Sequence, residues 1–255
     1  MAIKFALHVV IARPDRCQRL QLSEPEIFTL TRLELIFMKP QRRTSKAEET
    51  SKKRLNQIYV AAAQLFCDQG FDATSMNDIA DAVGLTKAGV YHFINGGKKD
   101  LLFAVMNYGM DRLETQVIAP AQSLADAELR LRSIINNHAQ LITGGSGPDG
   151  HDPVTIVVDE VAGLTPAQIR KINQRKRAYV DLIRVTLQTL RDEGKLKDVD
   201  VTVAAFSLLG MMLWLSRWFR PDGRLTREQV ADEISKIALG GLLRTKTRLS
   251  VASSG

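Results

Sequence analysis

The sequence contains very little cysteine. Cys17 and Cys67 are the two cysteines among 255 residues, which is too few for a disulfide framework or for a zinc site with four thiolate ligands. Because nothing in this composition calls for an oxidising compartment, we expect the protein in the cytoplasm.

Signatures of catalysis and of cofactor binding are also missing. The sequence has no Gly-rich loop of the kind that cradles phosphates and no nucleophile elbow. His138, His151, Asp159 and Glu160 fall on separate predicted elements, without the His-x-x-x-His spacing of a metal site. The sequence therefore predicts neither an enzyme nor a bound cofactor or metal ion.

Long apolar runs are scarce as well. Val201–Ser216 has 16 residues without a charge, whereas a spanning helix needs roughly 20. Its small residues, Ala204, Ala205 and Gly210 among them, favour close packing between helices, so we expect no membrane span. Phe5–Ala12 is apolar too, but it lacks the small-residue cleavage site of a signal peptide.

What the sequence does contain is helical periodicity. Apolar residues make up 45% of the chain and charged residues 25%, which is ordinary for a globular protein with a buried core. No alternating strand pattern and no internal repeat occurs. A helix is predicted from about residue 50 to Gly70. Six apolar residues fall on one face of it. These are Leu55, Ile58, Tyr59, Ala62, Leu65 and Phe66.

Two short helices are predicted next, over 76–83 and 87–93. Ser75 and Thr86 precede them as N-caps, and Gly84 ends the first one. A pair of short helices joined through a glycine turn and preceded by a longer helix is a helix-turn-helix. Such pairs also occur as plain packing units, in which case a residue such as Tyr91 would belong to the core.

Longer helices come next, and they make the predicted fold all-α. Because 144–153 is rich in glycine, a loop is predicted between the second and the third of these longer helices. The third begins at Thr165-Pro166-Ala167-Gln168, a strong helix start with a capping box. The predicted spans are 98–117, 125–143, 166–194, 201–219 and 226–243, the last with an apolar stripe at Val230, Ile234, Ile237, Ala238, Gly241 and Leu242.

The second short helix carries side chains that suit DNA. Ala88 and Gly89 permit close approach to the major groove, while Val90 and Phe93 turn inward. The net charge of +7 favours an acidic partner such as nucleic acid. Thr86 and Lys87 are predicted to contact a DNA phosphate at the helix N-terminus, and Tyr91 to contact another phosphate. His92 is predicted to contact a base edge or the DNA backbone, and Lys98 to contact the DNA backbone. A basic tract adds Lys39, Arg42, Arg43, Lys46, Lys52, Lys53 and Arg54.

The segment FDATSMNDIADAVGLTKAGVYHFINGGKKDLL resembles the DNA-binding segment of the TetR family of bacterial repressors, over about Lys52 to Leu102. The chain departs from the family in having Phe93-Ile94 where an aromatic pair is usual, and Gly96-Gly97 before the lysine. The resemblance implies an all-helical homodimer, a three-helix head, and a body of about six helices that binds a small effector. Carried over by position, the DNA-contacting residues would be Thr74, Thr86, Lys87, Tyr91, His92 and Lys98.

For the body the resemblance implies a dimer interface made by helices 199–219 and 226–243. Trp214 and Trp218 would anchor that interface or line a pocket, unless they are ordinary core. The body is also similar to members that sense lipid-derived or steroid-derived coenzyme A thioesters. The basic run from Arg170 to Arg177 could meet coenzyme A phosphates, or it could be a solvated helix face. Methionines could line an adaptable pocket or merely fill the core. The effector candidates are Met106, Met110, Arg170, Arg177 and Trp214.

The chain divides by composition into four parts. Residues 1–37 show no helical or strand period, and we hypothesise that Met38 is the true start. Residues 38–99 form the head with its basic arm, 100–245 form the body, and 246–255 form a polar tail. The predicted function is a ligand-responsive repressor bound to a pseudo-palindromic operator. The alternatives are a helical enzyme or carrier in which the head only packs, and a protein that coats DNA without specificity.

Overall fold

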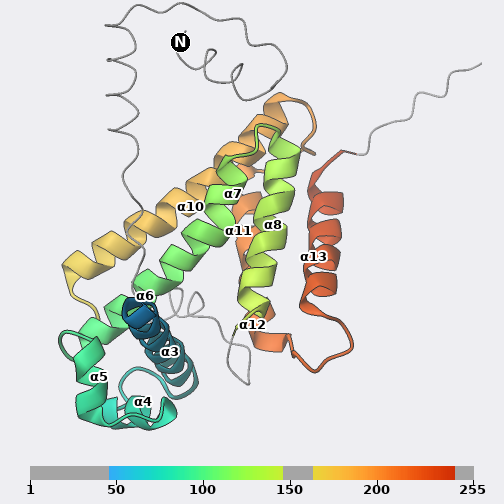
Figure 1. Ribbon diagram of the computed structural model, residues 1–255. Coiled ribbons are helices and arrows are strands. Elements are labelled where there is room, and N and C mark those ends of the chain that lie inside the picture. The colour runs from blue at the N-terminus through green and yellow to red at the C-terminus, as the bar shows by residue number, and fades with distance from the viewer. Residues whose placement is uncertain (1–45, 146–162, 245–255) are drawn as a thin grey trace, which may run out of the picture. The chain divides into compact units, whose positions relative to one another are not determined.

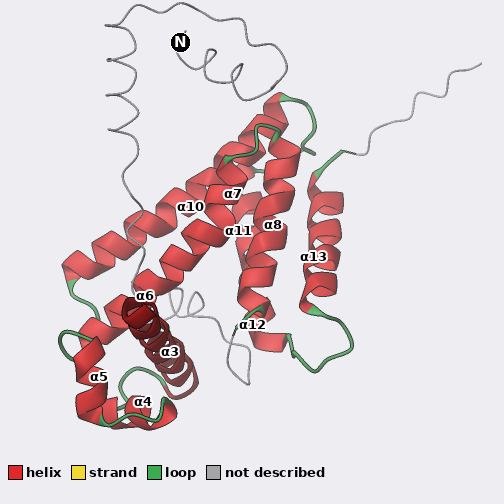
Figure 2. Cartoon of the chain, viewed as in Figure 1, coloured by secondary structure: helices red, strands yellow, loops and turns green. Residues whose placement is uncertain are grey.

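The computed structural model describes residues 46–145 and 163–244, and within these ranges the chain is helical with one isolated bridge, Leu196 with Leu243 (Figure 2). Ala47–Gly255 contains one compact unit, which holds nearly all of the described residues. The predicted all-α fold is confirmed. Several sequence-based assignments lie outside the described residues, namely Met38, Lys39, Arg42, Arg43, His151, Asp159, Glu160 and the tail 246–255.

The head consists of α3 (Lys46–Gln69), α4 (Met76–Ala82) and α5 (Lys87–Phe93), drawn in blue to cyan in Figure 1. The face predicted for α3 is the buried one, because Ile58, Ala62 and Phe66 are at most 3% exposed. They pack in one core with Ile79 of α4 and Val90 of α5, both 0% exposed. Apolar burial on this scale holds the three helices as a unit.

Local hydrogen bonds fix the ends of the two short helices. Ser75 and Asp78 form a capping box, in which Asp78 accepts from the Ser75 backbone N–H at 2.8 Å. That bond, followed by the Ser75 hydroxyl, holds the pKa of the Asp78 carboxyl below its usual value. Thr86 caps α5 by accepting from the Gly89 N–H at 3.0 Å. Between the helices Gly84 has φ +62°, a left-handed conformation that favours glycine.

The helix after the head is interrupted by a π-helical turn. It runs as α6 (Lys98–Leu113), the π turn η1 (Glu114–Ile118) and α7 (Ala119–Gln122), and we call it the lever helix. The Ala119 N–H donates to the carbonyl of Glu114, five residues earlier. Pro120 accounts for the irregularity, because it has no N–H and its ring crowds the carbonyl four residues before it. The sequence predicted one regular helix here.

The body is built around α8 (Ala127–Thr143). This helix packs against α10 (Pro166–Asp192), α11 (Val201–Leu213), α13 (Arg227–Leu242) and η1 (Figure 1). The predicted capping box at the start of α10 is present, with the Gln168 side chain accepting from the Thr165 N–H at 2.9 Å. The core between these helices is aliphatic. Its fully buried members include Leu131, Ile134, Ile135, Ile142, Ile172 and Ile183.

One prediction for the C-terminal helices is wrong. The expected helix 201–219 is broken at Trp214 into α11 and α12 (Leu215–Trp218). Within the apolar stripe predicted for α13, Ile237 is 61% exposed in one subunit, and Ala231 and Leu239, outside that stripe, are buried. The helix α13 thus has apolar residues on two faces, and a single subunit covers one of them.

The uncovered apolar residues continue onto α11 and α12. Val203, Phe206, Trp214 and Trp218 are between 48% and 65% exposed. By length and composition alone, Val201–Trp218 is apolar enough to cross a membrane, with 28% of it buried in the subunit. The sequence predicted no membrane span because the uncharged run ends at Ser216. The apolar window reaches two residues further, to Trp218, and therefore counts as a candidate span by length and composition. An exposed apolar surface of this kind indicates a partner for the face.

A polar pair is enclosed in the aliphatic core of the body. His138 of α8 is 1% exposed, and its Nδ1 lies 2.8 Å from the hydroxyl of Tyr179 on α10. The other ring nitrogen, Nε2, has no hydrogen-bond partner among the described residues. Burial lowers the pKa of His138 to about 4 and raises that of the Tyr179 hydroxyl. The imidazole is therefore neutral at neutral pH.

The buried imidazole makes stability depend on pH. Because the pKa of His138 is lower in the folded state than its ordinary value of 6.5, the unfolded chain binds the extra proton first as pH falls. The stabilisation is complete above the ordinary value and is lost as pH falls toward about 4. Between about pH 7 and pH 5 we expect a loss of about 2 kcal/mol from this group.

Urea unfolding of the wild type and of His138→Gln at both pH values measures this loss. The variant should be less stable at neutral pH yet lose less on acidification. Equal losses in the two proteins would show that His138 is not the responsible group.

Candidate nucleic-acid interface

Four of the predicted DNA contacts lie together on the exposed surface of α5. Thr86 and Lys87 are at its start, Tyr91 and His92 are one turn later, and all four are exposed. Tyr91 is 42% exposed, whereas Val90 beside it is completely buried in the head. The helix thus has one face committed to the core and one face that presents polar side chains to solvent, as the sequence predicted for Val90.

The chemistry of this face matches what DNA offers. Lys87 provides an ammonium, and Tyr91 provides a hydroxyl that can donate to a phosphate oxygen. Ala88 is exposed and small, so the backbone of α5 can approach a groove closely. The Thr86 hydroxyl already accepts the Gly89 N–H at 3.0 Å, and its own O–H can still donate.

Thr74 does not belong to this face. Its side chain is 1% exposed, and its hydroxyl donates to the carbonyl of Gly70 at 2.8 Å and to that of Leu65 at 3.2 Å. These bonds hold the turn between α3 and α4 closed. The prediction of a DNA contact through this side chain is therefore wrong, because the hydroxyl is used inside the head.

Lys98 is also turned inward. Its ammonium donates to the carbonyl oxygens of Phe71 at 2.7 Å, Asp72 at 3.2 Å and Thr74 at 2.8 Å. An ammonium has three donors, and these three carbonyls use them all. The ammonium also lies 4.4 Å from the centre of the Phe71 ring. We call this set of contacts the Lys98 clamp, and it replaces the predicted phosphate contact.

The double glycine before the clamp has a local explanation. Gly96 has φ +101°, and a Cβ on it would collide with the side chain of Asp100. Asp100 in turn accepts from the Gly97 N–H at 2.9 Å and so caps α6. Lys99, which was not predicted to contact DNA, is exposed beside Lys98. The cap spacing from Gly97 to Asp100 could have shown that the two lysines occupy different positions in the first turn.

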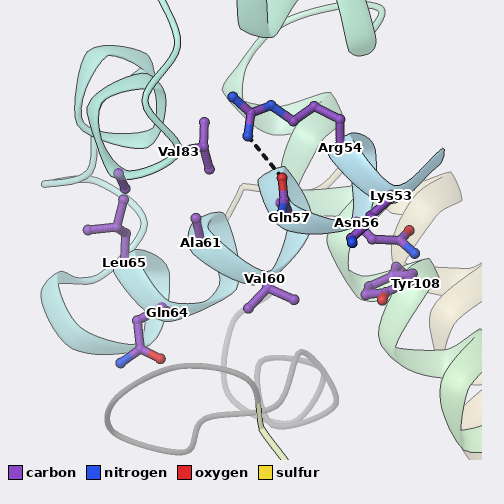
Figure 3. A pocket seen from close by; sticks show the side chains of 11 residues that line it. Lys53, Arg54, Asn56, Gln57, Val60, Ala61, Gln64, Leu65, Val83 and Tyr108 are labelled. Atoms are coloured by element: carbon purple, nitrogen blue, oxygen red, sulfur yellow. Dashed lines mark hydrogen bonds between the residues drawn. The ribbon is translucent and has the colours of Figure 1, made fainter. Parts of the chain in front are cut away.

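A hollow of about 660 Å³ lies along α3, between the end of α4 and Tyr108 of α6 (Figure 3). Val60, Ala61 and Leu65 are among its apolar lining, and Tyr108 of α6 closes one end. Arg54, at its rim, donates to the Gln57 side chain at 2.9 Å. The hollow is separate from the exposed face of α5 and was not predicted.

The structure does not gather the five predicted effector residues into one site. Met106 and Met110 are buried on α6, whereas Arg170 and Arg177 are exposed on α10 and Trp214 is 64% exposed at the end of α11. No residue of this set lines the hollow beside α3. The basic run on α10 is partly structural. Its Arg175 pairs with Asp111 of α6 at 2.7 Å and donates to the carbonyl of Asn107 at 3.3 Å.

Two family descriptions match this chain. Residues 58–105 match "Bacterial regulatory proteins, tetR family", and residues 125–242 match "Tetracyclin repressor-like, C-terminal domain". The first range contains α4 and α5, and the second contains α8 through α13. The first matched range therefore includes the helix-turn-helix of the head, and the second includes the main helices of the body.

Characterised relatives are matched over nearly their whole length. The transcriptional repressor KstR2 of Rhodococcus jostii is 28% identical over 77% of this chain and 95% of its own. The structure of AibR with isovaleryl coenzyme A and operator DNA is 43% identical, with a TM-score of 0.63 over 72% of this chain and 97% of AibR. The TetR family regulator PfmR of Thermus thermophilus is 30% identical, with a TM-score of 0.61 over 73% of this chain and 99% of PfmR.

Replacement of Tyr91 by phenylalanine should weaken binding to the DNA upstream of the chain's own coding sequence by about tenfold, because a hydrogen bond to a charged phosphate is lost. Fluorescence anisotropy at fixed salt measures the affinity. Tyr108→Phe removes a hydroxyl from α6 and is the matched control. Unchanged affinity of Tyr91→Phe would remove Tyr91 from the phosphate contacts.

Replacement of Lys98 by methionine should lower the free energy of unfolding by about 2 kcal/mol, because three carbonyl groups lose their donor. Lys99→Met, one residue away and exposed, should change stability by less than about 0.5 kcal/mol. Chemical denaturation compares the two. A variant of Lys98 that keeps full stability but loses DNA affinity would return Lys98 to the interface.

Proposed function

The chain belongs to the TetR family of bacterial regulatory proteins, and on that premise we propose that it is a transcriptional repressor that leaves its operator when a small effector binds. A member of this family is a DNA-binding regulator and not an enzyme. The observation that carries the proposal is the exposed face of α5, where Lys87, Tyr91 and His92 lie together within a helix-turn-helix whose opposite face is core.

The proposed DNA surface is revised from the sequence-based set. It keeps Thr86, Lys87, Tyr91 and His92, gains Lys99, and loses Thr74 and Lys98. Exposed Lys52 and Lys53 on α3 are proposed as additional phosphate contacts. Phosphate contacts of this kind make affinity fall steeply with salt. We assign 38–99 to the head and 100–245 to the body, and leave 1–37 and 246–255 as terminal segments.

The uncovered apolar face on α11, α12 and α13 supports a homodimer. Phe206, Trp214 and Ile237 are at least 57% exposed in one subunit, and large aromatic side chains of this kind anchor interfaces. A second copy of the chain would cover the face with its own equivalent residues. We prefer this occupant to a membrane because the same chain carries a DNA-binding head, and we place the regulator in the cytoplasm.

The dimer gives the operator its form. A two-fold axis relates the two heads, so each α5 would read one half of a pseudo-palindrome. The half-sites should be about one helical turn, roughly 34 Å, or a multiple of it apart.

We propose an acyl coenzyme A thioester as the effector. The support is the 43% identity to AibR, which was crystallised with isovaleryl coenzyme A and operator DNA. The methionines Met106 and Met110 of α6 are buried, and an acyl chain could displace such flexible side chains. Arg170, Arg177 and Trp214 remain candidates for polar and stacking contacts.

Release from DNA requires that the effector favour one arrangement of the heads. To shift the protein from a population that mostly can bind DNA to one that mostly cannot, the effector must bind the second state more tightly than the first by about 5 kcal/mol. The lever helix connects the two functions, since α6 starts at the Lys98 clamp in the head and passes along α10 in the body.

The test is binding of the purified protein to its own upstream DNA and to a scrambled duplex, at physiological salt, with and without isovaleryl coenzyme A. We expect selectivity of at least about a thousandfold for the upstream DNA and release by the thioester. Selective binding without release would discard the thioester and keep the regulator. Equal binding to both duplexes would favour a protein that coats DNA, unless site selection from random DNA finds an operator elsewhere.

A further inference from the structure

The hollow along α3 has the size of a ligand site. Its volume of about 660 Å³ lies within the range of roughly 300–1,000 Å³ that small-molecule sites occupy. Three elements line it, namely α3, the end of α4 through Ala82 and Val83, and α6 through Tyr108 (Figure 3). None of the predicted DNA contacts on α5 and none of the effector candidates in the body belongs to this lining.

An amide oxygen at one end of the hollow has no hydrogen-bond partner. The Gln64 side chain lines the hollow, and its Nε2 donates to the Asp68 carboxylate at 2.9 Å. Because a carboxylate only accepts, this bond fixes which amide atom of Gln64 is the oxygen. That oxygen, Oε1, is buried and accepts no hydrogen bond from the residues that the structure describes. A buried carbonyl oxygen calls for a donor, and the soft last torsion of glutamine lets it turn toward a donor in the hollow.

The opposite end of the hollow carries cations. Arg54 donates to the neutral side chain of Gln57 at 2.9 Å, and Lys53 is exposed beside it. Neither forms an ion pair within the described part of the chain, where the lining of the hollow also contains no carboxylate. The Arg54 guanidinium thus lies near Gln57. Gln64 follows Gln57 by seven residues, which is about 10 Å along a helix.

Between the two ends the lining is apolar. Val60 and Ala61 lie along α3 at this level, and α4 adds Val83 (Figure 3). The ring of Tyr108 stands at the cationic end and is supported by the Tyr59 ring, with the ring centres 5.3 Å apart. A flat aromatic body would contact aliphatic side chains along its length and an aromatic ring at one end.

We propose that this hollow binds a small hydroxylated aromatic carboxylic acid. Its carboxylate pairs with Arg54 and Lys53, its ring lies against the apolar lining, and its hydroxyl donates to Gln64 Oε1. An acid with these two groups at opposite ends, such as 4-hydroxycinnamate, matches the spacing along α3. The site lies in the head and is separate from the effector site proposed for the body.

Occupation of the hollow would also affect DNA binding. Lys53 is one of the proposed phosphate contacts, so a bound carboxylate competes with phosphate for it and lowers operator affinity by about threefold. This consequence rests on the proposed DNA-binding function. Binding to the hollow does not, because it is measured without DNA.

Isothermal titration calorimetry of the full-length protein measures the affinities for 4-hydroxycinnamate and for cinnamate, which lacks the hydroxyl. Gln64→Leu removes the acceptor, Arg54→Gln removes a cation, and Ala61→Leu fills the hollow with a good helix former. Gln69→Leu is the matched control for Gln64→Leu, because Gln69 is exposed at the end of α3 and outside the hollow. Thermal unfolding confirms that each variant is folded.

We expect the wild type to bind 4-hydroxycinnamate about fivefold more tightly than cinnamate, because one hydrogen bond is gained. Gln64→Leu should bind both acids equally, whereas Gln69→Leu should keep the preference. Arg54→Gln should weaken both acids about tenfold, and Ala61→Leu should bind neither. The inference is overturned if the wild type binds neither acid at about 5 mM, if a folded Ala61→Leu keeps full affinity, or if a folded Gln64→Leu keeps the preference.

The consequence for DNA is measured by fluorescence anisotropy with the upstream duplex, with and without saturating 4-hydroxycinnamate. A loss of affinity in the wild type that Ala61→Leu lacks supports competition at the hollow. Equal affinities with and without the acid overturn the competition and leave the site standing. If the wild type does not select the upstream DNA or any other sequence, the proposed function and this consequence fail together, while the calorimetric result on the hollow is unaffected.

Discussion

The arrangement of the head on the lever helix depends on one ammonium group. Lys98 is the first residue of α6, and its donors are bonded to three carbonyls of the turn that leads into α4. The same turn is closed by the Thr74 hydroxyl. The Phe71 ring contacts the Lys98 ammonium and also packs against Gly163, so closely that a Cβ added at Gly163 would lie 2.7 Å from the ring. The start of the body chain before α10 therefore meets the head at the same ring. A displacement of α6 cannot leave the helix-turn-helix in place, because the clamp joins them.

The other end of the lever is held differently. Arg175 pairs with Asp111 on the exposed side of α6, one turn before the π turn η1. The first end of the lever is thus fixed by hydrogen bonds inside the head, and the second end by an ion pair with α10.

Local signals in the sequence were sufficient for much of the fold and for half of the site. The caps at Ser75, Thr86 and Thr165 involve partners three residues away, so they can be predicted from the sequence without tertiary information. The exposed face of α5 followed from the burial of Val90. Lys98 and Lys99 could not be told apart by residue type, because what distinguishes them is a turn 24 to 27 residues earlier in the chain. Thr74 was misassigned because its residue type does not show that its hydroxyl donates to the carbonyls of Gly70 and Leu65 inside the head.

Two copies of this chain, in the proposed mechanism, read two halves of one operator through α5. Selection of bound duplexes from a pool of random DNA by the purified full-length protein, followed by sequencing, tests this claim most directly. We predict enrichment of an inverted repeat whose half-site centres are about one helical turn or a multiple of it apart. Enrichment of a single unrepeated site, or of no sequence at all, would contradict it.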